Sequence, residues 1–478
     1  MLFNSFEFAI FLPLTFIVYW FLINKRLSLQ NLFLIAASYF FYGWWDWRFL
    51  SLIIISSSVD YIIGLQIYNC ERIVKRKLLL SISIAVNLGF LGFFKYYNFF
   101  LDNIADMYSV FGLTFNLQTL KIILPVGISF YTFQTLSYTI DIYNKRQKPT
   151  KDIIAFFAFV SFFPQLVAGQ IERARNLLPQ FTQTRKFNYQ FASDGLKMIA
   201  WGLFKKIVIA DSFAKSVDYI FINYDSLNGN TLMIGAVYFA FQIYCDFSGY
   251  SDIARGVARL FGFDLMQNFA FPYFSENVAE FWKRWHISLS TWFRDYVYFP
   301  LGGNRCGKFR HSFNIMITFL LSGLWHGANW TFICWGALHG LYLLIYRFIK
   351  NPINYPISGL SSSFLTAVRS FVRIGVTFLL TTLAWIFFRA DNIDVALAYI
   401  SRIMTLSLFS RGVFPANVDN YLWYILFLVC VEWIQRNKQH PLFLYRMPII
   451  VRWPIYIILT LWIVDSFAQP ETFIYFQF

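Results

Sequence analysis

The sequence is poor in charged residues and histidines, and its cysteines form no metal-binding pattern. Charged residues make up 14% of the 478 positions, whereas a soluble domain has about a quarter. No internal repeat or low-complexity segment is present. The cysteines are few and scattered, so we expect neither a disulfide framework nor a metal site; they are Cys70, Cys245, Cys306, Cys334 and Cys430.

The chain is instead rich in apolar residues. Hydrophobic residues make up 58% of the chain and aromatic residues 22%. Apolar runs of membrane-spanning length recur along the whole sequence. They predict one all-α polytopic membrane domain over 1–478 with roughly ten to twelve transmembrane helices. The candidate spans lie near 7–24, 31–45, 48–69, 78–101, 121–141, 152–169, 195–222, 231–260, 312–348 (one long or two short segments), 370–389, 421–435 and 452–468.

The net charge of +15 is best explained by basic loops that meet anionic membrane lipid. Nucleic-acid binding does not fit such an apolar chain, and we expect none. Basic residues gather at 25–26, 71–77 and 144–148, after the first, third and fifth candidate spans. The positive-inside rule then places the N-terminus outside the cell (inner) membrane. The first apolar run lacks a basic segment before it and a cleavage site, so we expect it to be retained.

Two segments combine proline or glycine with apolar sequence, at 124–130 and 161–170. Non-helical backbone at membrane depth is tolerated only where protein or a water-filled cavity covers it. These segments are therefore either re-entrant walls of a buried site or ordinary kinked helices.

The segment 280–296 has the pattern of an amphipathic helix that lies in the membrane interface. At 100° per residue, its charged residues form one arc and its tryptophans the other. His286 falls on the apolar side, so we expect its ring to point into protein or lipid. A buried histidine most often has a structural role, but the loop at 300–305, with Gly302 and Gly303, permits close backbone approach.

His286, His326 and His339 lie within 54 residues of one another. Ionisable groups in membrane segments are costly, which makes them functional candidates. A neutral, buried His326 suits a general base. His326 and His339 would face different ways on one straight helix, so either Gly327 breaks the helix or the two rings serve different walls.

The motifs within 276–345 resemble those of the membrane-bound O-acyltransferase family, and most closely its bacterial alginate O-acetyltransferase branch. The resemblance rests on Phe281-Trp-Lys-Arg-Trp-His-Ile-Ser, extending to Arg305, and on Trp325-His-Gly-Ala-Asn-Trp and Trp335-Gly-Ala-Leu-His-Gly. It implies a ring of helices, some short or horizontal, around a central tunnel. It also implies that His326 is catalytic, that His286 is a second histidine of the site, and that His339 has a supporting role.

The chemistry of acyl transfer needs a base and donors for the developing oxyanion. His326 can be the base, while Asn329, Ser322, His286 or backbone N–H groups near Gly327 can donate. Asp246 and Asp252 can orient an imidazole, although a packing role is the more frequent one for such residues. Basic residues near the interfacial segment would attract a phosphorylated donor or an acidic carrier, unless they are ordinary positive-inside charges; they are Lys283, Arg284, Arg305, Lys308 and Arg310.

The resemblance implies a thioester donor, acetyl-CoA or an acylated acyl carrier protein, with no bound cofactor. It implies a polysaccharide acceptor such as alginate, acylated directly or through a periplasmic SGNH-type acetyltransferase partner. The alternatives are transfer of D-alanine from a carrier protein to teichoic acid and, in a different class, a lipid or polysaccharide transporter. A transporter of this size would show inverted repeats, which the sequence lacks.

Overall fold

The computed structural model describes residues 1–113, 119–350, 363–409, 418, 420–438, 440–445, 447–467 and 473–474, and this part of the chain is helical without any strand. The predicted all-α class is therefore confirmed. The α-helices are α1 (Phe6–Ile17), α2 (Leu27–Asp46), α3 (Leu50–Asn69), α4 (Ile73–Leu91), α5 (Tyr97–Val110), α6 (Ile128–Tyr143), α7 (Ile153–Ser161), α8 (Phe163–Leu166), α9 (Ala174–Thr182), α10 (Tyr189–Leu203), α11 (Asp211–Ile222), α12 (Gly229–Leu260), α13 (Val278–Arg284), α14 (Ile287–Phe293), α15 (Lys308–His326), α16 (Trp330–Lys350), α17 (Ser363–Arg389), α18 (Ile393–Ile403), α19 (Leu422–Gln435) and α20 (Ile449–Asp465).

The chain forms two compact units. Unit 1 comprises Met1–Ile199 and Ile253–Met266, and unit 2 comprises Ala200–Asp252 and Gln267–Phe478. The prediction of a single membrane domain over 1–478 requires the two units to form one body, and it stays a prediction.

Five helical stretches of the described chain are long and apolar enough to cross a membrane. They are Leu27–Asn69, Ile73–Val110, Gly229–Leu260, Trp330–Ile349 and Leu365–Arg389. Apolar runs alone predict roughly ten to twelve spans. The difference arises because several of these runs fold into shorter helices, including α6 and α7, and because two neighbouring runs share the single stretch Leu27–Asn69. The architecture is that of a multi-pass membrane protein.

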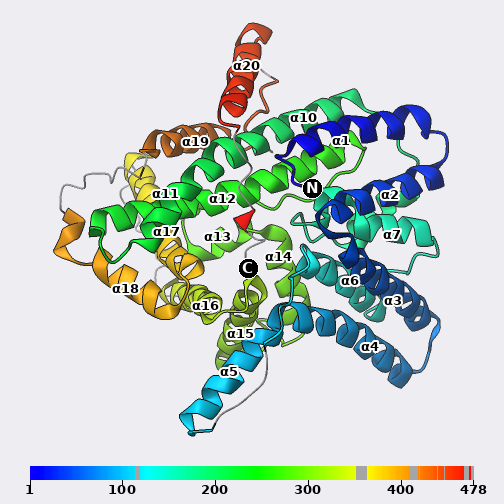
Figure 1. Cartoon of the computed structure of the whole chain (residues 1–478), viewed down its shortest axis with the longest axis horizontal. Helices are drawn as coiled ribbons and strands as arrows, with labels where there is room; N and C mark the ends of the chain where they lie inside the picture. Colours follow the sequence, from blue (N-terminus) through cyan, green and yellow to red (C-terminus); the bar gives the residue numbers. More distant parts are fainter. Residues whose placement is uncertain are drawn as a thin grey trace. The chain divides into compact units, whose positions relative to one another are not determined.

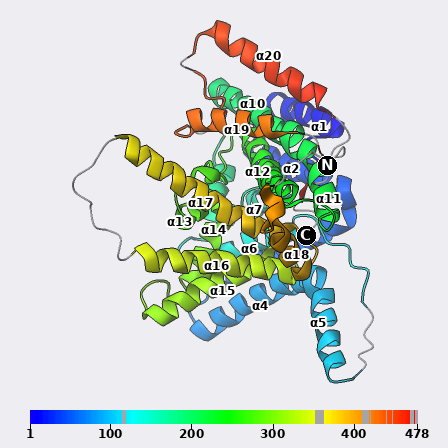
Figure 2. The same cartoon turned by 90° about the vertical axis from the view of Figure 1, so that its left-hand side faces the viewer.

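In unit 1, helices α3, α4 and α6 pack against one another (Figures 1 and 2). Asp60 of α3 is fully buried and accepts hydrogen bonds from Ser83 (2.6 Å) and Asn87 (2.8 Å) of α4. A buried carboxyl group is costly unless such partners surround it. The three side chains therefore fix the register of α3 against α4 in an apolar setting.

The two broken segments predicted from the sequence lie against each other in unit 1. Gly127 has φ +77° and precedes α6, while α7 ends at Ser161 and is followed by the single turn α8. A Cβ atom at Gly127 would lie 2.6 Å from the carbonyl oxygen of Leu166, so only glycine permits this close approach. Residues 161–174 are all buried, and protein therefore covers the irregular backbone, as a membrane protein requires.

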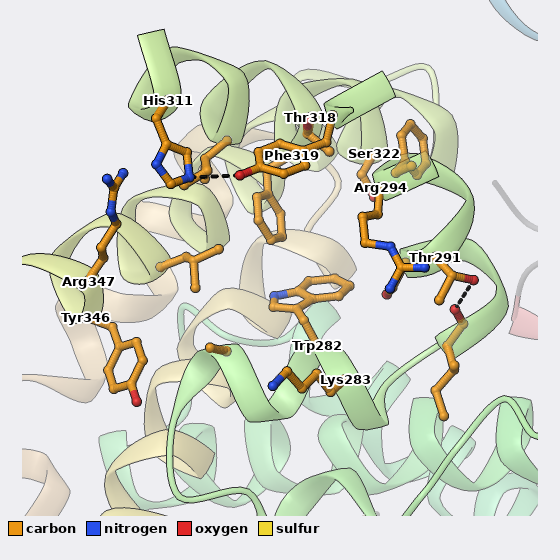
Figure 3. Close-up of a pocket in the computed structure, with 17 residues that line it drawn as sticks. Trp282, Lys283, Thr291, Arg294, His311, Thr318, Phe319, Ser322, Tyr346 and Arg347 are labelled. Atoms are coloured by element: carbon orange, nitrogen blue, oxygen red, sulfur yellow. Dashed lines mark hydrogen bonds between the residues drawn. The ribbon is translucent and has the colours of Figure 1, made fainter. Parts of the chain in front are cut away.

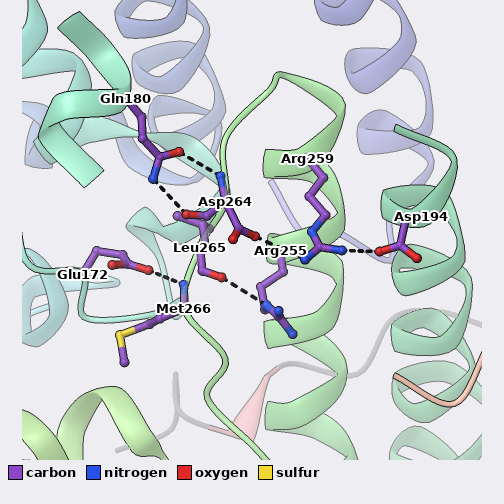
Figure 4. A network of polar contacts seen from close by, with 8 residues as sticks. All are labelled: Glu172, Gln180, Asp194, Arg255, Arg259, Asp264, Leu265 and Met266. Carbon is purple, nitrogen blue, oxygen red and sulfur yellow. Dashed lines mark hydrogen bonds and ion pairs between the residues drawn. The ribbon is translucent and has the colours of Figure 1, made fainter. Parts of the chain in front are cut away.

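The C-terminal end of α12 in unit 1 is held by a network of buried charges (Figure 4). Arg259 pairs with Asp194 of α10 and with Asp264. Glu172 is fully buried and accepts a hydrogen bond from the backbone N–H of Met266. Its burial raises the pKa of Glu172 to about 7. The network fixes the course of the chain from α12 to Met266.

In unit 2, α15 and α16 form an antiparallel hairpin that carries His326 and His339 (Figures 1 and 2). Helix α15 ends at His326, and Gly327 has an extended backbone. Helix α16 begins at Trp330, after the side chain of Asn329 accepts a hydrogen bond from Thr331 N–H (3.0 Å). Of the two arrangements left open by the sequence, the break at Gly327 is the one observed, and the predicted 312–348 segment consists of two helices.

Candidate active site

The segment 280–296 is not one straight helix, and that prediction is wrong. Asn277 caps α13 by accepting a hydrogen bond from Glu280 N–H (2.9 Å), and α13 ends at Arg284. His286 then adopts a left-handed conformation with φ 42° and ψ 56° before α14 begins. A left-handed residue cannot continue a right-handed helix. The histidine therefore sits at a corner between two short helices.

His286 is fully buried, as its place on the apolar side predicts. The side-chain oxygen of Asn268 lies 3.4 Å from Nδ1 of His286. The ring of Phe247 meets the imidazole edge-on, with 4.7 Å between centroids. Burial lowers the pKa of His286 from 6.5 to about 3, because an apolar environment disfavours the charged form. His286 is thus a neutral imidazole at physiological pH.

His326 is buried (3% exposed) beside His286 at the end of α15. The two imidazole centroids are 6.5 Å apart, although 40 residues separate them in sequence. Aromatic rings enclose His326: Trp325, Trp335 and Phe388 lie at centroid distances of 5.0, 4.9 and 5.3 Å. Such a setting excludes bulk water, which strengthens electrostatic interactions inside it.

His339 contacts the same Trp335 indole, at 4.9 Å between centroids. The indole N–H of Trp282 donates to Nδ1 of His339 (3.3 Å). The neutral ring must then carry its proton on Nε2. His339 is fully buried. Within the described ranges its Nε2 has no hydrogen-bond partner. The structure thus brings His286, His326 and His339 into one aromatic cluster.

Of the predicted supporting residues, Ser322 lies near His326, whereas Asn329 and Asp246 bond to other groups. Ser322 lies one turn before His326 on α15 and is buried. Asn329 caps α16 and donates to the carbonyl oxygen of Asp391 (2.9 Å), so its amide is engaged away from the imidazoles. Asp246 pairs with Lys206 (2.7 Å) and accepts from Ile474 N–H (2.8 Å). These partners hold Asp246 in an ion pair and a backbone hydrogen bond.

A cavity of about 600 Å³ adjoins the histidine cluster (Figure 3). Trp282, whose indole bonds to His339, and Phe319 both line it and contact each other, with 5.2 Å between ring centroids. Ser322 also lies in its wall. The cavity is mainly apolar with a few basic groups, a combination typical of small-molecule sites. Its lining residues are Ala279, Trp282, Lys283, Ile287, Ser290, Thr291, Phe293, Arg294, Tyr298, His311, Ile315, Thr318, Phe319, Ser322, Leu343, Tyr346 and Arg347.

The basic lining of this cavity overlaps only partly with the residues predicted for donor binding. Of that predicted set, Lys283 lines the cavity. Arg284 instead pairs with Glu280 one turn earlier (2.6 Å), and Arg305, Lys308 and Arg310 are exposed around the start of α15.

Three basic residues of the cavity were not predicted from the sequence to bind the donor: Arg294, His311 and Arg347. His311 is hydrogen-bonded to the hydroxyl of Tyr298 (2.8 Å), and partial burial together with the Arg347 guanidinium lowers its pKa. Arg347 interrupts the end of an apolar run, and that interruption is the signal that marks it in the sequence.

The arrangement can perform proton transfer beside an apolar, water-poor cavity. A neutral imidazole in such a site accepts a proton from a hydroxyl group as that group attacks an electrophile. Among the described residues, no group of three or more His, Cys, Asp or Glu side chains is placed to hold a metal ion.

The chain is similar to one family model and to several known proteins. The model of the membrane-bound O-acyltransferase family matches residues 78–381. The probable alginate O-acetylase AlgI of Azotobacter vinelandii is 42% identical over 83% of this chain and 76% of its own length. The peptidoglycan O-acetyltransferase of Helicobacter pylori is 36% identical over 85% and 80%. The teichoic acid D-alanyltransferase of Streptococcus thermophilus is 31% identical over 46% and 56%.

These relatives are acyl-transferring enzymes, and the predicted resemblance to the alginate branch is confirmed. The protein is a multi-pass membrane O-acyltransferase, and its chain belongs to the membrane-bound O-acyltransferase family.

Proposed function

We propose that the protein moves an acetyl group from a cytoplasmic thioester donor towards hydroxyl groups of an extracytoplasmic polysaccharide, such as alginate or another exopolysaccharide. The observation that carries the proposal is the pair of buried imidazoles, 6.5 Å apart, beside the basic-lined cavity. The higher identity and coverage of the alginate O-acetylase relatives favour an acetyl group over D-alanine.

His326 acts as the general base in this proposal. It takes the proton of the acceptor hydroxyl while the oxygen forms a bond to the thioester carbonyl carbon. The C–S bond then breaks, and the proton passes from His326 to the leaving thiolate, so that the imidazole returns to its neutral form. The N–H of His339 at Nε2 is a buried donor in the same cluster and supports stabilisation of the oxyanion.

The donor occupies the cavity of about 600 Å³, with its thioester towards Ser322 and Trp282. Lys283, Arg294 and Arg347 would attract the phosphates of acetyl-CoA or the acidic surface of an acyl carrier protein. The apolar wall suits the uncharged part of the donor.

The protein lies in the cell inner membrane with its N-terminus outside, because the basic loops at 25–26, 71–77 and 144–148 favour the cytoplasm. The acceptor is either the polymer itself or a periplasmic SGNH-type acetyltransferase that completes the transfer. Addition of such a partner to the assay separates these two routes.

The proposal is tested in proteoliposomes with radiolabelled acetyl-CoA outside and polysaccharide inside. We expect His326→Gln to abolish labelling with insertion intact, while His286→Gln retains measurable activity, because a base contributes more than a supporting residue. Active His326→Gln together with inactive His286→Gln would reverse the two roles. Label from a D-alanyl carrier and none from acetyl-CoA would instead establish the D-alanine alternative, and acceptor movement without acyl transfer would establish the transporter.

A further inference from the structure

Asn268 binds the helix break at His286 with both its backbone and its side chain. It lies after α12 and is buried (1% exposed). Its carbonyl oxygen accepts from Ile287 N–H (2.9 Å), and its side-chain oxygen accepts from Ser288 N–H (3.0 Å). The same side-chain oxygen lies 3.4 Å from His286 Nδ1. A residue distant in sequence thus holds the imidazole and the start of α14 together.

These contacts determine which nitrogen of His286 carries the proton. A backbone N–H can only donate, so the Asn268 atom that faces Ser288 is the oxygen. The amide nitrogen, on the other side, donates to Ser251 (3.4 Å). Because that oxygen can only accept, His286 Nδ1 must be the protonated nitrogen, and Nε2 keeps its lone pair.

We propose that Asn268 is a positioning residue that holds His286 as the Nδ1–H tautomer, so that His286 acts in the site as a hydrogen-bond acceptor through Nε2 and not as an oxyanion donor. The inference rests on the proposed function and deepens it. It assigns opposite tautomers to two histidines of one cluster, since Trp282 leaves His339 with its proton on Nε2. His286 then accepts a hydrogen bond through Nε2, and His339 donates one.

Asn268 is a polar partner of His286 in surroundings rich in aromatic rings. Phe247 of α12, Phe269 and Trp325 of α15 contact the ring, and the titratable ring that contacts it is His326 of α15. The nearby charges of α12 are paired away from it: Asp246 pairs with Lys206 and Asp252 with Lys205. A charge placed at Asn268 would therefore act directly on His286.

The test is Asn268→Asp against Asn268→Ala in the proteoliposome assay between pH 4 and 8. Removal of the partner in Asn268→Ala should lower kcat on the order of 10–100-fold with KM unchanged, by analogy with the loss of hydrogen-bond partners of metal-bound histidines. Asn268→Asp still accepts from Nδ1–H and should restore most of kcat at pH 8. Its negative charge should raise the pKa of His286 by about 1–3 units, so that activity falls as pH is lowered within the measured range.

Asn314→Asp is the matched control, because Asn314 is equally buried in unit 2 but bonds to the carbonyl of Gly303 (3.1 Å) and not to a histidine. Asn314→Asp should leave the pH profile of kcat unchanged. Identical pH profiles for wild type and Asn268→Asp, or a normal kcat in Asn268→Ala, would overturn the proposal.

Thermal unfolding over the same pH range gives a readout that does not need turnover. The lowered pKa of His286 makes the wild type lose stability as pH falls from 6.5 towards 3. Asn268→Asp should reduce that loss, and the reduction should vanish in the His286→Gln background. If stability responds in this way while the wild type transfers no acetyl group, the Asn268–His286 pair stands and the proposed function is wrong.

Discussion

Gly336→Ala should disable the enzyme although it adds one methyl group and touches no catalytic residue. Gly336 of α16 packs against α15, where an added Cβ atom would lie 2.3 Å from the carbonyl oxygen of Phe319. Ordinary contact begins near 3.4 Å, so the two helices must separate by about 1 Å. Such overpacking costs about 1–3 kcal/mol. Because α15 carries His326 and α16 carries His339, a shift of this size can lower the rate about 100-fold.

The measurement pairs the acyl-transfer rate with the thermal unfolding midpoint in detergent. Gly375→Ala on α17 is the control, because a Cβ atom there meets nothing within 4 Å. Alanine is a better helix former than glycine by about 1 kcal/mol, so this control should be as stable as the wild type or more so and fully active. If Gly336→Ala keeps both normal stability and normal rate, the close packing of the hairpin does not position the histidines, and the reasoning fails.

Two further predictions concern charge. Arg347→Glu should raise KM for the donor about tenfold, equivalent to about 1.4 kcal/mol, and make KM less sensitive to salt. Arg369→Glu, at an exposed position on α17 outside the cavity, should change neither. Equal KM values for the two variants would remove Arg347 from donor binding. Glu172→Gln should flatten the pH dependence of stability between pH 4.5 and 7. The raised pKa of Glu172 means that the wild type is stabilised at low pH and loses that stability as pH rises towards 7, and an unchanged slope in unfolding experiments would contradict this.

The sequence predicts the helical class and the burial of His286, because each depends on local pattern, and it offers the break at Gly327 as one of two arrangements. It does not predict the corner at His286, since neither glycine nor proline marks it and its partner Asn268 lies 18 residues earlier. The basic residues of the cavity were only partly predicted, because they come from helices that only tertiary packing brings together. Lys283 lies in the recognised motif, but Arg347 reaches the cavity from a different helix through tertiary packing.

The left-handed backbone of His286 limits which amino acids can replace it, independently of chemistry. At φ 42° most side chains cost roughly 1–2 kcal/mol, whereas glycine, asparagine and aspartate are tolerated well. His286→Gln therefore combines a chemical change with backbone strain, and His286→Asn separates the two. In a saturation library at this position, the variants that still fold should be those whose residue tolerates the left-handed conformation. Survival of activity should select, from that set, the members that still present an acceptor towards His326.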